Sequence, residues 1–373
     1  MSRVERLEVF AVEDTGAQIV WGHLDPGEVR IRWHAGERSL ESDGGPGGVL
    51  IDGLTPSSTT SVEVLLDGRL VCPVVVRTLA SPPGEELGRF ATLNDLHLGT
   101  RRFGLAPTFV ERVPHSEAHP IRCASAAIGD ALEWGAQRLV IKGDIVESSH
   151  PHTWSLVSDL VGGLAIPVDM ICGNHDRNQV STVDPFTEAA RAGLRLHRDV
   201  TAIDIEGLRL VLVDSSVNSI DVGVWRPHTA ATRHVVATSD RPVMLLIHHQ
   251  PQSTPVPVYL PRGISSLTAK RFLRTMSSAN PAIFGSSGHT HRNRHRVIRG
   301  VPWSEIGSPK DYPGVWAGYV VHEGGIRQVV RRVTRPDCIR WTEQTRSSGL
   351  GTWGRWSPGT LEQRCLSHSW PDR

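Results

Sequence analysis

Two patterns of hydrophobic and polar positions divide the chain. From residue 4 to about residue 79, short runs alternate apolar with polar residues and are rich in β-branched side chains. Gly, Pro, Asp and Ser separate these runs at the regular spacing that is typical of a β-sandwich. We therefore expect a small all-β sandwich with strands at residues 8–12, 18–22, 29–33, 48–51, 61–66 and 71–78.

After residue 89 the pattern changes to short, continuously apolar runs that alternate with stretches of helical period. This order of strands and helices predicts an α/β domain with parallel strands and right-handed crossovers. The expected strands are 90–94, 138–142, 168–172, 242–247 and 281–285, and the expected helices are 121–132, 153–164 and 185–192.

The predicted organisation has four segments. Residues 1–80 form the β-sandwich, and residues 81–88 form a linker that contains two prolines and a glycine. Residues 89–322 form the α/β domain. Residues 323–373 form a Trp-rich cap or tail, which we expect to pack on the α/β domain or on a partner subunit, with a lid over the site as an alternative. Its tryptophans are Trp341, Trp353, Trp356 and Trp370.

Five of the predicted strands end in side chains that bind metal ions. The carboxyl ends of parallel strands meet at one edge of a sheet, where ligands bind. Alternate residues of an extended segment point the same way, so Asp95 and His97 can reach one cation. Asp144 has two carboxylate oxygens and can therefore bridge two ions. The candidate residues at the strand ends are Asp95, His97, Asp144, Asn174, His175, Asp176, His248, His289 and His291.

Carboxylate and imidazole ligands suit metals such as Mn, Fe or Zn. Taken alone, the sequence Gly-Asn-His-Asp at 173–176 also fits a simple turn in which glycine adopts a positive φ and Asp caps a helix. Five such strand ends in one chain exclude chance as the explanation. Two further residues have less definite roles: Glu147 is expected outside the direct ligands, and His249 contacts either a ligand or the substrate.

Composition narrows the choice of partners and compartment. The formal net charge of +1 gives no overall basic field, so nucleic acid is not an expected partner. The chain has no apolar run of membrane-spanning length, and its first ten residues lack the apolar core of a signal peptide, so we expect a cytoplasmic location without membrane contact. The five cysteines have no CxxC spacing and indicate reduced thiols. The oligomeric state is left open.

The motifs Asp-x-His, Gly-Asp, Gly-Asn-His-Asp, His and Gly-His-x-His, in this order, resemble those of the calcineurin-like metallophosphoesterases. The resemblance spans roughly residues 89–310 and is strongest to class III cyclic-nucleotide phosphodiesterases. It implies a four-layer αββα sandwich. The corner at 53–56 resembles fibronectin type III domains, and the sandwich placed ahead of the catalytic domain is similar to purple acid phosphatases. Those enzymes have a tyrosine ligand where this chain has Glu147.

The resemblance also implies a ligand set for two divalent or trivalent metal ions. One ion would be held by Asp95, His97, Asp144 and His291, and the other by Asp144, Asn174, His248 and His289. Two such ions lower the pKa of a bridging water until it is largely hydroxide near neutral pH. His175 would stabilise or protonate the leaving oxygen, with Asp176 orienting its imidazole.

The expected function is therefore hydrolysis of a small phosphoester, favouring a phosphodiester such as a cyclic nucleotide or a glycerophosphodiester, by attack of a metal-bridging hydroxide. The first alternative is a phosphomonoesterase or nucleotidase. A nuclease is less favoured because the chain lacks an interleaved aromatic and basic groove pattern. A non-catalytic scaffold is less favoured because every ligand and acid position is filled.

Overall fold

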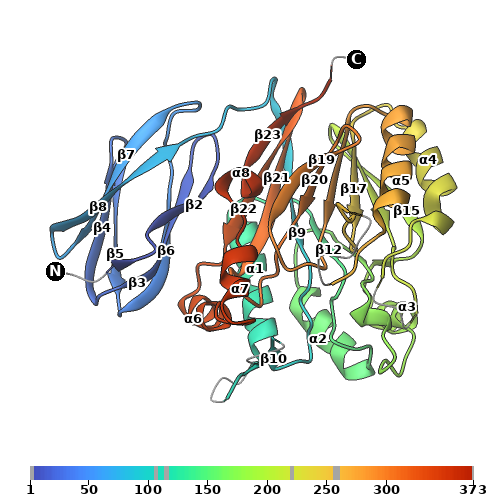
Figure 1. The fold of residues 1–373 in the computed structure, drawn as a ribbon, viewed down its shortest axis with the longest axis horizontal. Coiled ribbons are helices and arrows are strands. Elements are labelled where there is room, and N and C mark those ends of the chain that lie inside the picture. Colours follow the sequence, from blue (N-terminus) through green and yellow to red (C-terminus); the bar gives the residue numbers. More distant parts are fainter. Residues whose placement is uncertain (1–3, 105–107, 113–116, 219–221, 255–260, 372–373) are drawn as a thin grey trace.

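The computed structural model describes residues 4–104, 108–112, 117–218, 222–254 and 261–371. Its N-terminal part is a β-sandwich of two antiparallel sheets, at the blue end of the chain in Figure 1. One sheet contains β1 (Val4–Glu5), β2 (Glu8–Val12), β3 (Ala17–Leu24) and β6 (Gly45–Ile51). The other contains β4 (Gly27–Trp33), β5 (Gly36–Ser42), β7 (Thr59–Leu66) and β8 (Arg69–Arg77).

The rest of the chain is built on two larger mixed sheets. The first is seven-stranded, and its parallel half consists of β14 (Leu196–His197), β13 (Val168–Ile171), β12 (Leu139–Lys142) and β9 (Glu86–Leu93). It continues in antiparallel fashion through β21 (Val315–His322), β22 (Gly325–Arg332) and β23 (Leu366–Ser369).

The second sheet has six strands, in the order β15-β16-β17-β18-β20-β19. Four neighbouring strands are parallel: β16 (Leu208–Val213), β17 (Val243–Ile247), β18 (Ile283–Ser287) and β20 (Val301–Glu305). The outer strands β15 (Val200–Ile205) and β19 (Arg294–Ile298) run antiparallel to them. Strand β17 is buried along its whole length, which explains why it is continuously apolar in sequence.

Helices cover the outer faces of both sheets. Helices α1 (His119–Glu133) and α2 (Pro151–Val161) pack together, and α1 lies against β9 and β21 of the first sheet. Helices α4 (Thr229–Ala237) and α5 (Ser266–Ala279) cover the second sheet, at the opposite side of the domain in Figure 1. In α1 the buried residues recur at helical spacing, which gives the apolar stripe that faces the sheet. The four layers confirm the predicted αββα fold.

The remaining elements are short. They are β10 (Arg102–Phe103), β11 (Phe109–Val110), η1 (His175–Arg177), α3 (Pro185–Arg191), η2 (Arg226–His228), α6 (Pro336–Thr345), α7 (Thr352–Trp356) and α8 (Leu361–Arg364). Strands β22 and β23 extend the first sheet with residues beyond 322, whereas the sequence pattern predicted only a cap or tail there. The four segment boundaries stay predictions. No helix in the described residues is long and apolar enough to cross a membrane.

The β-sandwich shares a continuous hydrophobic core with the first large sheet. Polar contacts reinforce this junction. The buried carboxylate of Glu13 accepts a hydrogen bond from the Trp134 indole (3.1 Å) and forms ion pairs with Arg327 (3.4 Å) and Arg331. Because these charges are removed from water, each depends on its partner. The sandwich is therefore an integral part of the molecule.

We predict that Glu13→Gln lowers the free energy of unfolding by about 3–5 kcal/mol, because it leaves buried arginines without a full counter-charge. Urea denaturation measures this change. The matched control is Glu41→Gln on the exposed strand β5, which should alter stability by no more than about 0.5 kcal/mol. Equal stabilities of the two variants would contradict the structural importance of the junction.

Candidate metal centre

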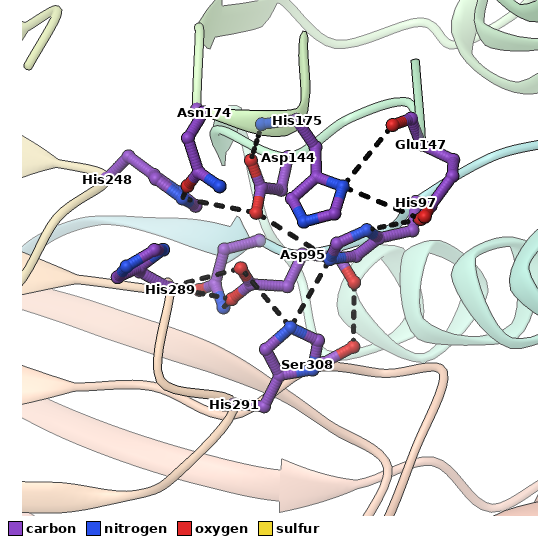
Figure 2. Close-up of polar contacts among 12 residues, drawn as sticks. Asp95, His97, Asp144, Glu147, Asn174, His175, His248, His289, His291 and Ser308 are labelled. Atoms are coloured by element: carbon purple, nitrogen blue, oxygen red, sulfur yellow. Dashed lines mark hydrogen bonds and ion pairs between the residues drawn. The ribbon is translucent and has the colours of Figure 1, made fainter. Parts of the chain in front are cut away.

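The predicted site residues gather at the carboxyl edge of the two large sheets, as Figure 2 shows. Asp95 and His97 follow β9, and Asp144 follows β12. Asn174 and His175 follow β13, at the start of η1. From the second sheet, His248 follows β17, and His289 and His291 follow β18. All seven predicted metal ligands are thus brought into one buried cluster.

Potential ligand atoms lie close enough together to bind cations. The Nε2 atoms of His97 and His291 are 3.3 Å apart, and the His291 Nε2 lies 3.6 Å from Asp95 Oδ1. Asp144 Oδ2 lies 3.7 Å from His97 Nε2 and 3.3 Å from His248 Nε2. Asp144 therefore occupies the middle of the cluster, where a bridging carboxylate would have to be.

On the other side of Asp144, the Asn174 amide oxygen lies 3.2 Å from His248 Nε2. His289 is joined to Asp95 through its backbone N–H, which lies 3.0 Å from Asp95 Oδ2. The atoms of Asp95, His97 and His291 form one group within 4.8 Å, those of Asp95, Asp144 and His248 form a second, and those of His248, His249 and His289 form a third. This donor set of carboxylates and imidazoles fits a dinuclear site.

The backbone is strained where these ligands sit. Positive φ angles occur at Asp95 (56°), His97 (49°), Asp144 (49°), His289 (69°) and His291 (51°). Such angles are uncommon for non-glycine residues and persist only where the surroundings enforce them, often at functional sites. Gly173 is needed for close approach, because a Cβ there would lie 2.2 Å from Asp144 Oδ1 and 2.7 Å from His248 Nε2.

Hydrogen bonds at Nδ1 turn three imidazoles toward the centre. His248 donates to the Lys142 backbone oxygen (2.8 Å), His97 contacts Glu147 Oε2 (2.8 Å), and His291 contacts Asp311 Oδ2 (2.6 Å). With Nδ1 occupied, the Nε2 lone pair of each ring is available to a metal. His289 is reversed, because its Nε2 contacts the backbone oxygen of Arg262 at 2.9 Å.

Electrostatics prepares some of these residues for cations. Against the effect of burial, Asp144 raises the pKa of His248 to about 9 and Asp311 raises the pKa of His291, whereas Asp144, His97 and His289 shift the other way. Burial alone would raise the pKa of Asp144, but the neighbouring His248 and His175 hold it well below its usual range. Burial and the nearby Lys310 ammonium lower the pKa of His97. Burial lowers the pKa of His289 to about 3. Asp144, His97 and His289 are therefore held as a carboxylate and as neutral imidazoles, the forms that bind metals.

His175 lies at the open side of the cluster. Its side chain is 34% exposed, compared with 6% for His97, and the two rings are 4.4 Å apart. Its backbone N–H donates to Asp144 Oδ1 (2.8 Å), and its Nδ1 lies 3.3 Å from the Glu147 backbone oxygen. This placement leaves the imidazole free to face a bound substrate.

The expected role of Asp176 in orienting His175 needs correction. The Asp176 carboxylate accepts hydrogen bonds from the backbone N–H groups of Gly173 (2.7 Å) and Val146 (2.9 Å), so it braces the loop instead. The backbone oxygen of Glu147 takes the orienting position, since it lies 3.3 Å from His175 Nδ1. The local sequence places Asp176 beside His175, but its side chain turns to the opposite side of the loop.

Other candidates also take definite places. The Nδ1 of buried His249 contacts Ser215 Oγ (2.9 Å), and its Nε2 has no hydrogen-bond partner within the described part of the chain. In the connection at 101–120, buried His119 stacks on Trp341 and contacts Glu111, while His115 lies outside the described residues. Sequence reasoning missed Asp311, whose only local signal is an acidic residue after a buried strand.

No protein-family model matches the chain, and no curated protein matches it. Among solved structures, PhoD is 10% identical, with 90% of this chain and 87% of that chain covered and a TM-score of 0.46. GAP50, the anchor in the inner membrane complex of Plasmodium, is 13% identical, with coverages of 68% and 87% and a TM-score of 0.45. Phosphopantetheinyl hydrolase from Mycobacterium tuberculosis is 14% identical, with coverages of 61% and 92% and a TM-score of 0.37.

Structural similarity at these identities and TM-scores does not by itself support a classification. The classification rests on the sheets and the cluster: two mixed sheets inside four layers, and ligands at the carboxyl ends of five strands. Both features are those that the resemblance of the motifs to the calcineurin-like metallophosphoesterases implied.

We predict that Asp144→Asn abolishes binding of both metals, because the central carboxylate contacts both halves of the cluster. Metal analysis of the purified variant, with circular dichroism to verify folding, measures this. Asp159→Asn, on the exposed surface of α2, is the matched control and should keep full metal content. Two ions still bound to folded Asp144→Asn would refute the bridging position.

A second substitution tests the support of His291. Asp311 is fully buried and accepts hydrogen bonds from His291 Nδ1 and from the Trp353 indole (3.2 Å). Asp311→Asn should weaken metal binding about 10- to 100-fold, the usual loss when the carboxylate behind a ligating histidine is changed. Titration calorimetry of the metal-free protein gives the affinity. An unchanged affinity would mean that Asp311 only supports the fold.

Proposed function

We propose that this protein hydrolyses phosphoesters with two bound metal ions, and that its preferred substrate is a phosphodiester. The observation that carries the proposal is the position of Asp144 between two sets of ligands, each of which draws on both large sheets. The mixture of imidazole, carboxylate and amide donors supports Mn, Fe or Zn as the metals. Two ions of this kind, when bound, activate water and neutralise the oxygens of a phosphoryl group.

The side chains of the site have separate roles in binding the ions and in proton transfer. The ligand set would hold the ions in a buried pocket, where electrostatic interactions are stronger than in water. Glu147 fixes the ring of His97 and lies beside His175. His175 is the most exposed histidine of the cluster, and it would hold a proton for the leaving oxygen.

A general acid beside the leaving oxygen supports the preference for a diester with an alkoxide leaving group. An alkoxide is a strong base and leaves slowly unless it receives a proton. A nitrophenolate leaves readily without one. The importance of His175 should therefore depend on the leaving group, which gives the proposal a direct test.

We predict that His175→Ala keeps both metals, because the contact to Asp144 comes from the backbone N–H and survives the substitution. Hydrolysis of a nucleotide diester should fall about 100- to 10,000-fold. Hydrolysis of bis-p-nitrophenyl phosphate should fall much less. Steady-state kinetics on both substrates and metal analysis provide the measurements.

His152→Ala, on the exposed face of α2, serves as the control and should behave as the unaltered protein. Equal rate losses on the two substrates together with reduced metal content would show that His175 only supports the loop. An unaltered protein that hydrolyses neither substrate after addition of Mn, Fe or Zn would refute phosphoesterase activity itself.

A further inference from the structure

Lysine is rare in this chain, and two of its three lysines are buried. Lys142, Lys270 and Lys310 are the only lysines among the 40 Lys and Arg residues. Lys142 is 0% exposed and Lys310 is 4% exposed. Burying an ammonium group is costly unless it is paired, so each buried lysine needs a reason for its position.

Lys142 has its partners within the protein. Its Nζ donates to Ser286 Oγ (2.7 Å) and to the Ser287 backbone oxygen (3.1 Å), between the two large sheets. Lys310 differs, because its Nζ has no hydrogen-bond acceptor among the described residues. Its nearest recorded neighbours are Asp311 Oδ2, at 4.0 Å, and the ring of Phe103, whose centroid is 5.1 Å away. The ammonium group therefore has only the Asp311 carboxylate, at ion-pair distance, as a counter-charge.

The backbone of Lys310 is fixed by the metal centre. Its N–H donates to Ser308 Oγ (3.1 Å), and that hydroxyl donates to the backbone oxygen of Asp95 (2.8 Å). The Lys310 backbone oxygen accepts a hydrogen bond from the Trp341 indole (2.7 Å). The position of this ammonium group is therefore set by the same loop that holds a metal ligand.

The ammonium lies on the side of the cluster formed by His97 and His291. Asp311 Oδ2 contacts both the His291 ring and the Lys310 ammonium, and Phe103 lies 6.4 Å from the His291 ring centroid. The charge of Lys310 is also close enough to lower the pKa of His97. Asp311 already accepts hydrogen bonds from His291 and Trp353, so its carboxylate is shared with other donors.

We propose that Lys310 binds a non-bridging oxygen of the substrate phosphoryl group, next to the metal held by His97 and His291. A lysine is a compact charge on a flexible stem, suited to meeting an anion that arrives with the substrate. The assignment rests on the proposed function for its substrate. It makes Lys310 a phosphate-binding residue in addition to the metals.

Binding of inorganic phosphate to the metal-loaded protein tests this assignment without any turnover. Titration calorimetry is carried out on the unaltered protein, Lys310→Met, Lys310→Arg and the control Lys270→Met on α5. Lys310→Met should bind phosphate about 10- to 100-fold more weakly, the loss expected for one charge-assisted hydrogen bond. Lys310→Arg should recover most of the affinity, and Lys270→Met should match the unaltered protein.

Metal analysis of the same samples separates phosphate binding from support of the centre. Full metal content in Lys310→Met together with weaker phosphate binding supports the proposal. Loss of metal in Lys310→Met, unchanged phosphate affinity, or no phosphate binding to the unaltered protein would overturn it. If phosphate binds in a Lys310-dependent way but no phosphoester is hydrolysed, the proposed function fails while this binding site stands.

Discussion

The structure depends on one electrostatic constraint: carboxylates and imidazoles from both sheets are buried together. Asp95 and His248 are 0% exposed, and Asp144 is 2% exposed. Buried charges of this kind are stable only with paired partners or metal ions. The parallel strands, the glycines at 143 and 173, and the left-handed backbone at five ligands all serve to bring these groups together. Removing the central charge would leave its neighbours unpaired.

Around this centre, a second set of groups orients the metal ligands. Backbone oxygens and the carboxylates of Glu147 and Asp311 orient the histidines. The C-terminal segment contacts this region, because the Trp353 indole contacts Asp311 and the Trp341 indole contacts the backbone of Lys310. Residues after 322 thus complete the first sheet and also support the metal site. This double role explains why so many tryptophans are concentrated there.

The junction between the β-sandwich and the first large sheet also depends on paired buried charges, although it is separate from the metal centre. Glu13 brings a charge into an apolar interface and meets two arginines of β22 and the indole of Trp134. Such pairs fix the relative position of two packed layers more than they add stability. These pairs join the sandwich to β22, which lies in the same sheet as β9 and β12.

The sequence alone determined the four-layer class and predicted the seven candidate ligands, because apolar period, strand length and the polar residues that end each strand are local properties. It could not determine the partners of those ligands. Asp176 is adjacent to His175 in sequence yet binds Gly173 and Val146, whereas Glu147 and Asp311 reach the histidines from separate loops. Only the tertiary structure decides which distant loops meet, since that depends on how the two sheets pack and where each loop crosses the edge.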